Sequence, residues 1–133
     1  MPAVPQGLTD EQFADLSAKV RAAAGHLSDD IHVHGSRAAH TADAASDLDI
    51  AIRVTPERFD LILAARFGTP APGSAKERTM QHAQQTGKIQ AGEAGLRVLR
   101  KTLESDLGIA VDIAVIRQHG SFDQGPYLPL KMD

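Results

Sequence analysis

The chain has 133 residues, no cysteine and a formal net charge of -3 at neutral pH. This length suits one domain that buries its own core. The lack of cysteine excludes disulfides and thiolate zinc sites, and the net negative charge argues against broad binding to duplex nucleic acid. No apolar run approaches the roughly 20 residues that cross a bilayer, and residues 1–5 do not open a signal peptide. If the domain is exported, another part of a longer polypeptide must carry the export signal.

The first elements expected are a helix and a short strand. Thr9 and Gln12 stand at the ends of a capping-box pattern, which predicts a helix from there to about Ala24. Its apolar face would be formed by residues at helical spacing, Phe13, Leu16 and Val20. Ile31 and Val33 then alternate as the inward positions of a strand.

A Gly-Ser turn at Gly35 and Ser36 follows this strand, and a second strand is expected from about Asp47 to Val54. Because side chains alternate along a strand, Asp47 and Asp49 point to the same side. Two neighbouring carboxylates repel each other, and a hard divalent cation, Mg²⁺ or Mn²⁺, would relieve that repulsion. Backbone N–H groups of the turn could hold a phosphate. Taken alone, the Gly-Ser pair also fits an ordinary turn, and the Asp-x-Asp pair also fits a solvated strand face.

The middle of the chain predicts three helices. Threonine followed by proline opens the first, over 55–67, and Gly68 ends it. A capping-box pattern at Ser74 opens the second, over 74–87, and the third runs over about 92–107. A Pro- and Gly-rich loop separates the first two.

A third strand is expected over 109–116, and it carries Asp112 among apolar residues. A buried carboxylate in such a strand needs a strongly favourable partner. Its neighbours on the same strand face, Ala110 and Ala114, are small and would leave space for a metal and a triphosphate. The alternative is a salt-bridged aspartate on an edge strand. The expected fold is α/β (α+β), with a small mixed sheet flanked by helices in one domain over 1–133, of which 1–7 and 118–133 are largely irregular.

Charge is unevenly distributed along the chain. Residues 1–50 have a balance of -5 and residues 76–101 a balance of +4. Basic side chains that could neutralise a pyrophosphate or an acceptor are Arg37, Lys76, Arg78 and Lys88. Three others are expected to lie on a solvated helix face away from the acids: Arg97, Arg100 and Lys101.

In the order strand, Gly-Ser turn, loop and Asp-x-Asp strand, this sequence resembles the DNA polymerase beta-like nucleotidyltransferase superfamily. The resemblance implies that Asp47, Asp49 and Asp112 form a catalytic, metal-binding triad. It also implies that Gly35 and Ser36 bind the nucleotide. One departure is at residue 40, where such loops often carry glycine; histidine can adopt a left-handed turn there at some cost.

Nearly the whole chain looks like the nucleotidyltransferase modules at the C-terminal ends of bacterial polymorphic toxins of the Rhs and filamentous-haemagglutinin types. The segments that carry this likeness are Gln12–Phe13, His34–Ala39, Gly73–Arg78, Thr86–Ile89 and Phe122–Pro126. The resemblance implies transfer of a nucleoside monophosphate from an NTP to RNA, such as tRNA, or to a protein.

The toxin resemblance also implies delivery as the C-terminal part of a secreted or surface protein, action in the bacterial cytoplasm and a cognate immunity protein. Two alternatives stay open. One is an antitoxin-type adenylyltransferase that modifies its toxin, and the other is a degenerate module that binds a nucleotide without reacting.

Overall fold

The computed structural model describes residues 4–131, and the expectations for residues 1–3 and 132–133 lie outside this range. The N-terminal half contains α1 (Asp10–Ala24), β1 (Ile31–His34), α2 (Ser36–Ala39), β2 (Leu48–Val54) and α3 (Pro56–Phe67). The C-terminal half contains α4 (Ala75–Thr86), β3 (Lys88–Gln90), α5 (Arg97–Leu107), β4 (Val111–Arg117) and β5 (Leu128–Pro129).

The strands form one mixed sheet in the order β3-β4-β2-β1-β5. β1 pairs with β2 and β5, and β3 pairs with β4, in antiparallel fashion, whereas β2 and β4 are parallel. The parallel pair is joined by a long crossover that includes α3, α4, β3 and α5. The expected mixed sheet flanked by helices is confirmed.

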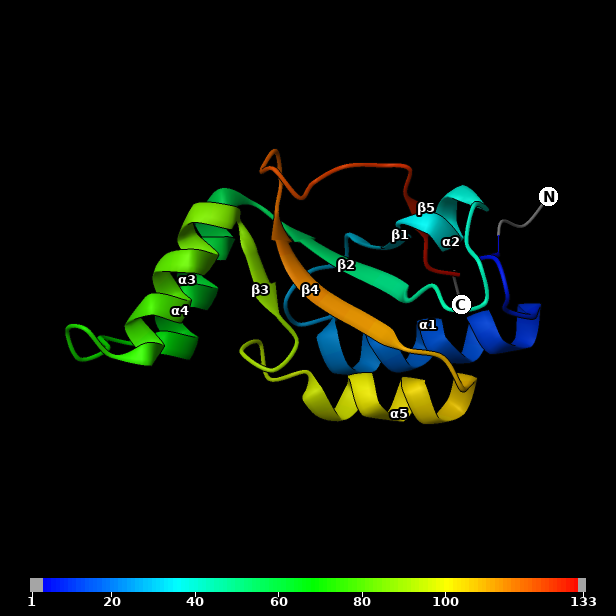
Figure 1. Cartoon of the computed structure of the whole chain (residues 1–133), viewed down its shortest axis with the longest axis horizontal. Coiled ribbons are helices and arrows are strands. Elements are labelled where there is room, and N and C mark those ends of the chain that lie inside the picture. Colours follow the sequence, from blue (N-terminus) through cyan, green and yellow to red (C-terminus); the bar gives the residue numbers. More distant parts are fainter. Residues whose placement is uncertain (1–3, 132–133) are drawn as a thin grey trace.

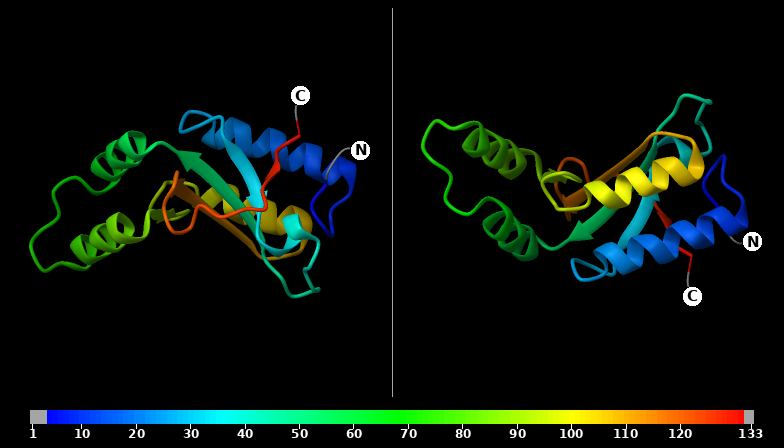
Figure 2. Two further views of the ribbon diagram at one scale, coloured as in Figure 1. Left: turned by 90° about the horizontal axis from the view of Figure 1, so that it is seen from above. Right: turned by 90° about the horizontal axis from the view of Figure 1, so that it is seen from below.

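The two faces of the sheet are covered differently. α1 and α5 lie side by side under one face, and α3 and α4 form a hairpin that projects from one end (Figures 1 and 2). The segment between β4 and β5 crosses the opposite face (Figure 1). The main core lies between the sheet and the α1–α5 layer and includes Phe13, Leu16, Val33, Leu48, Ile50, Ile52, Leu103 and Ile113.

Local sequence signals for the helix ends are confirmed. The Thr9 side chain accepts a hydrogen bond from Gln12 N, and the Gln12 side chain accepts one from Thr9 N. Thr55 and Ser74 cap α3 and α4 through their side chains. His40 has φ 58° and ψ 36° and ends the single turn of α2 in the left-handed conformation. Histidine therefore occupies the backbone position for which glycine is the easier residue.

Other expectations need correction. α5 begins at Arg97, because the glycine-rich segment before it forms turns and Gly95 has φ +77°. The expected third strand is β4, and it begins at Val111. β3 was not expected, since three residues are too few to show a strand period; its pairing with β4 defines it. The tail also contains β5, which pairs with β1.

Candidate active site

The open face of the sheet carries a row of three polar side chains in register. His34 of β1 pairs with Asp49 of β2, and Asp49 pairs with Asp112 of β4. Neighbouring strands lie about 4.8 Å apart, so the two carboxylates project side by side. Asp47 lies one residue before β2 and is exposed. The three acids expected from the sequence therefore lie at one end of the β2–β4 pair, and we call them the acid row.

The acid row holds more negative charge than its surroundings neutralise. Burial, followed by the charges of Asp112 and Asp47, raises the pKa of Asp49 to about 6. The positive charge of Lys88 acts in the opposite direction and lowers the pKa of Asp49. The Lys88 ammonium nitrogen lies 3.7 Å from Asp112 Oδ2, in the carboxylate beside Asp49. Asp49 therefore carries an unfavourable charge beside two other carboxylates, and a proton or a bound cation would stabilise this cluster.

Gly35 lies directly against the acid row. It has φ +74°, a conformation that L side chains rarely adopt. A Cβ atom built on Gly35 would lie 2.4 Å from Asp49 Oδ2. The turn therefore requires glycine for two reasons, its backbone conformation and the close approach of the carboxylate. Ser36 follows as the first residue of α2.

His34, beside Asp49, is half-buried. Burial, followed by the charge of Lys88, lowers the pKa of its imidazole. Its ring stacks on Tyr127 with centroids 6.1 Å apart. We therefore expect a neutral imidazole at pH 7, which leaves the negative charge of the acid row uncompensated from the β1 side.

Of the small residues beside the acid row, Ala110 is exposed and lines a groove with Asp47 and Asp112, as the sequence suggested, whereas Ala51 and Ala114 are covered. Ala51 and Ala114 are 0% and 2% exposed, and they pack with Ile116 beneath Tyr127. Tyr127 belongs to the segment that crosses this face. Space for a ligand therefore lies at the acid row and towards the sheet end, where Asp47 and Asp112 line an open groove.

The segment over the alanines is attached by a second polar cluster, the Arg53 cluster. Arg53 Nε donates to Asp123 Oδ1 at 2.7 Å, and Arg53 Nη1 donates to Asp30 Oδ2 at 2.8 Å. The Tyr127 hydroxyl also donates to Asp123, and Tyr127 lies beneath the Arg53 guanidinium, 5.0 Å from ring centroid to Cζ. These contacts hold the pKa of the Asp123 carboxyl well below its usual range.

Arg37 does not have the expected position for binding phosphate. Its side chain is buried, and Nη1 donates to Gln6 O at 2.8 Å while Nη2 donates to Ser46 O at 2.9 Å. The guanidinium thus joins the N-terminal segment to the loop before β2. Its role in the structure is to hold the turn of α2 in place.

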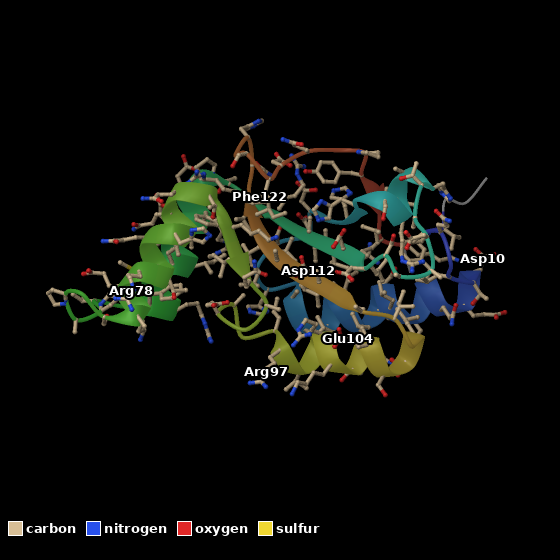
Figure 3. All side chains as sticks on the ribbon, viewed as in Figure 1. Asp10, Arg78, Arg97, Glu104, Asp112 and Phe122 are labelled. Carbon is tan, nitrogen blue, oxygen red and sulfur yellow. The ribbon has the colours of Figure 1, made fainter. Side chains whose placement is uncertain are left out.

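Lys76 and Arg78 also lie apart from the acid row. Both are exposed in the first half of α4, and Arg78 Nη1 donates to Gly73 O within the loop at the end of the hairpin. Figure 3 shows Arg78 at the far end of the α3–α4 hairpin and Asp112 in the middle of the sheet. Of the basic residues proposed to contact the nucleotide or acceptor, the structure brings Lys88 to the acids.

Arg100 is nearer to the site than expected. It lines the same groove as Asp47 and Asp112, whereas the sequence suggested a place on a solvated helix face. Its Nη1 donates to Glu104 at 3.2 Å, and the other oxygen of Glu104 accepts from Val111 N. The only sequence signal was the four-residue spacing of Arg100 and Glu104, which is common on exposed helices.

The donor set suits a hard divalent cation. Asp49 and Asp112 offer carboxylate oxygens from adjacent strands, and Asp47 offers a third from the loop; Mg²⁺ prefers such oxygens with water or substrate phosphate as further ligands. Within residues 4–131, no group of three His, Asp or Glu side chains is placed so that it could hold a metal ion by itself. An open arrangement of this kind fits a cation that arrives with a nucleotide.

Over residues 4–131, no helix has the length and apolar character to cross a membrane.

Comparison with known proteins gives no match: no family description fits the chain, and neither a curated protein nor a solved structure is significantly similar to it.

Proposed function

We propose that this protein is a metal-dependent nucleotidyltransferase that moves a nucleoside monophosphate from an NTP to an acceptor hydroxyl. The observation that carries this proposal is the register of Asp49 with Asp112 on adjacent parallel strands, directly beside Gly35. The raised pKa of Asp49 supports it, because the repulsion between Asp49 and the carboxylates of Asp112 and Asp47 would be relieved by a bound cation. The resemblance of the Gly-Ser and Asp-x-Asp segments to the nucleotidyltransferase superfamily agrees with this placement.

Each acid has its own part. Asp47 and Asp49 would hold Mg²⁺ or Mn²⁺ on the side of the NTP phosphates, and Asp49 with Asp112 would hold a second cation on the acceptor side. When bound, the two cations neutralise charge on the attacking and leaving oxygens. Gly35 directly precedes α2 and Ser36 is its first residue; N–H groups at this position have no partner within the helical turn, so they can donate to the phosphates.

The transfer is an in-line displacement at the α-phosphorus. A bond forms between the acceptor oxygen and phosphorus, and the bond from phosphorus to the β-phosphate oxygen breaks with its electron pair, so that pyrophosphate leaves. The hydroxyl proton passes to the carboxylate of Asp112. The chain contributes mainly orientation and charge placement.

The acceptor in this proposal is RNA, such as tRNA, or a protein side chain. The likeness to polymorphic-toxin modules supports an effector that acts in the bacterial cytoplasm, is delivered as part of a secreted or surface protein and is countered by a cognate immunity protein. Expression inside a bacterium should then arrest growth, and Asp49→Asn should remove the arrest. Normal growth with soluble wild-type protein would contradict the toxin assignment.

The direct test is transfer of label. The purified chain is incubated with each α-³²P-labelled NTP, Mg²⁺ and total cell RNA or protein, and the labelled species are separated. We expect one NTP to label one class of acceptor, and EDTA to prevent it. Asp112→Ala should lose transfer while NTP affinity changes little, since Asp112 serves the acceptor side. Labelling that persists in Asp49→Asn would contradict the proposed site.

One observation favours a non-catalytic nucleotide-binding module as a second candidate. The Lys88 ammonium already lies 3.7 Å from Asp112, where it partly replaces a cation. In that case the chain would bind an NTP without labelling any acceptor. Removing the lysine charge in Lys88→Met would then strengthen metal binding without producing transfer.

A further inference from the structure

A cavity lies between α4 and the edge strand β3. Phe67 of α3 and Phe122 of the tail contribute aromatic walls, and Ala83 and Ile89 add apolar surface. Polar side chains from α4, β3 and the following turn complete the lining: Thr79, His82, Thr86, Lys88, Gln90 and Glu93. An apolar cavity with a few polar groups is the usual form of a small-ligand site.

The size of the cavity suits one planar ring. Its volume is about 150 Å³, and a cavity of about that size in another protein holds benzene. Phe122 is 43% exposed, so its ring is accessible to a ligand in the cavity. A peptide segment or a helix would not fit in this space.

Lys88 connects the cavity to the acid row. Its ammonium lies 4.8 Å from the centroid of Phe122 and 3.7 Å from Asp112 Oδ2. A group whose ring occupies the cavity therefore places its next atoms within reach of the lysine and the acids. Figure 3 shows Asp112 on β4 and Phe122 on the tail, beyond the end of β4 that lies next to the α3–α4 hairpin.

The position of the cavity indicates which reactant enters it. Gly35 lies on the β1 side of Asp49, whereas Asp112, Lys88 and the cavity lie on the β4–β3 side. In-line displacement requires the attacking and leaving oxygens on opposite sides of phosphorus. If the leaving pyrophosphate lies at Gly35, the acceptor arrives from the side of Lys88.

We propose that the cavity between α4, β3 and Phe122 binds the terminal nucleobase of a single-stranded RNA acceptor and thereby presents its ribose hydroxyl to Asp112. The role as an acceptor site rests on the proposed nucleotidyl transfer. Phe122 stacks on the base, and Gln90 and Glu93 face its polar edge.

Charge at the cavity favours RNA over a protein side chain. Lys88 lines the cavity, and Arg66 lies next to it, where its Nε donates to Glu93 O at 2.7 Å. These two cations outnumber the one carboxylate that lines the cavity, that of Glu93, and suit the phosphodiester that links the terminal nucleotide to the next. Aromatic stacking on a base also contributes binding without requiring a particular sequence.

The test uses two RNA probes of four nucleotides with a fluorescent label at the 5′ end. One has four cytidines, so that it ends in a base with a single ring, and a free 3′ hydroxyl; the other has an abasic 3′ nucleotide. Binding to the full chain is measured by anisotropy in EDTA without NTP. We expect the intact probe to bind at least about fivefold more tightly, the low end for one stacked base.

Two variants test the cavity itself. Phe122→Leu removes the aromatic ring but keeps an apolar side chain, and Thr79→Phe fills the cavity from an exposed position of α4. Both should erase the difference between the probes. Val98→Ala is the matched control, because Val98 is 79% exposed on α5 and should leave the difference intact.

The kinetic experiment separates this proposal from the proposed function. Phe122→Leu should raise KM for the RNA acceptor and leave KM for NTP unchanged. Base-dependent RNA binding without any transfer would uphold the cavity but not the enzyme. Equal binding of the two probes, or none, would overturn the cavity proposal. So would a rise in KM for NTP alone, or competition by a tyrosine peptide in place of RNA.

Discussion

Two clusters of carboxylates lie on the same face of the sheet, and they differ in how their charge is balanced. In the Arg53 cluster, Asp30 and Asp123 share one guanidinium, and the pKa of Asp123 is lowered. In the acid row, Asp49 and Asp112 lie in register and the pKa of Asp49 is raised to about 6. In the Arg53 cluster the carboxylates are ion-paired and link two segments of the chain. In the acid row the negative charge is not balanced until a further positive charge binds. This difference distinguishes a binding site from a stabilising network more clearly than the number of acids.

The largest expected effect is on catalysis. Asp49→Asn should reduce nucleotidyl transfer by about 1,000-fold or more, because several kcal/mol of charge stabilisation in the transition state is lost. Asp123→Asn should retain transfer of the wild-type order. Initial rates with labelled NTP measure both variants. Equal losses in the two would show that the clusters do not have separate roles.

The next effect is on stability, and here the change in the Arg53 cluster is the one expected to be harmful. Asp123→Asn should lower the free energy of unfolding by about 2 kcal/mol, because hydrogen bonds from Arg53 and from His119 N lose their charged acceptor. Since the native pKa of Asp123 is depressed, its contribution is present above pH 3.8 and is lost as the pH falls from there towards the lower native pKa. Urea unfolding at pH 7 and pH 3 measures this change. Tyr127→Phe, which removes one donor and keeps the ion pair, should cost less.

In metal-free buffer, Asp49→Asn should stabilise the protein at pH 7.5 by about 1 kcal/mol after allowance for solvent screening. The raised native pKa means that the native state binds more protons than the unfolded state between pH 3.8 and about 6, so wild-type stability falls as the pH rises through this window. The gain from the variant should therefore disappear near pH 4. Thermal unfolding in EDTA measures it. A destabilised variant at pH 7.5 would show that Asp49 is already paired.

The smallest effect concerns Lys88, which forms an ion pair with Asp112 of the acid row. Lys88→Met should raise KM for the acceptor by about fivefold, which corresponds to about 1 kcal/mol for one charged contact. Arg78→Met is the matched control and should leave KM unchanged, because Arg78 lies at the far end of the hairpin. Steady-state kinetics with RNA acceptor measures both. A larger loss in Arg78→Met would place the acceptor on α4.

Local signals in the sequence predicted most of the fold. The capping patterns at Thr9, Thr55 and Ser74 specify helix starts through contacts within four residues, and these were right. β3 and β5 could not be predicted, because they have three and two residues and depend on pairing with β4 and β1. Their positions follow from tertiary packing and leave no period in the sequence.

The acidic residues of the candidate site could be predicted from the sequence, whereas the basic residues could not. Asp49 and Asp112 interrupt apolar strands, so their alternation fixes the face they occupy. Arg37 and Arg78 have long side chains whose charge can serve a backbone carbonyl as readily as a ligand, and here both donate to carbonyls. Lys88 was distinguishable only through the β3–β4 register, which brings it within 3.7 Å of Asp112.

The parallel pairing of β2 and β4 has a consequence for the order in which the site forms. Gly35 and Asp49 come from an antiparallel pair close in sequence, and such local contacts form early in folding. Asp112 reaches Asp49 only after the whole crossover between them has closed, which carries a larger entropic cost. On a ribosome, the first half of the acid row would therefore be present well before the second. The Asp49–Asp112 pair would be assembled only once β4 has been synthesised and has joined the sheet.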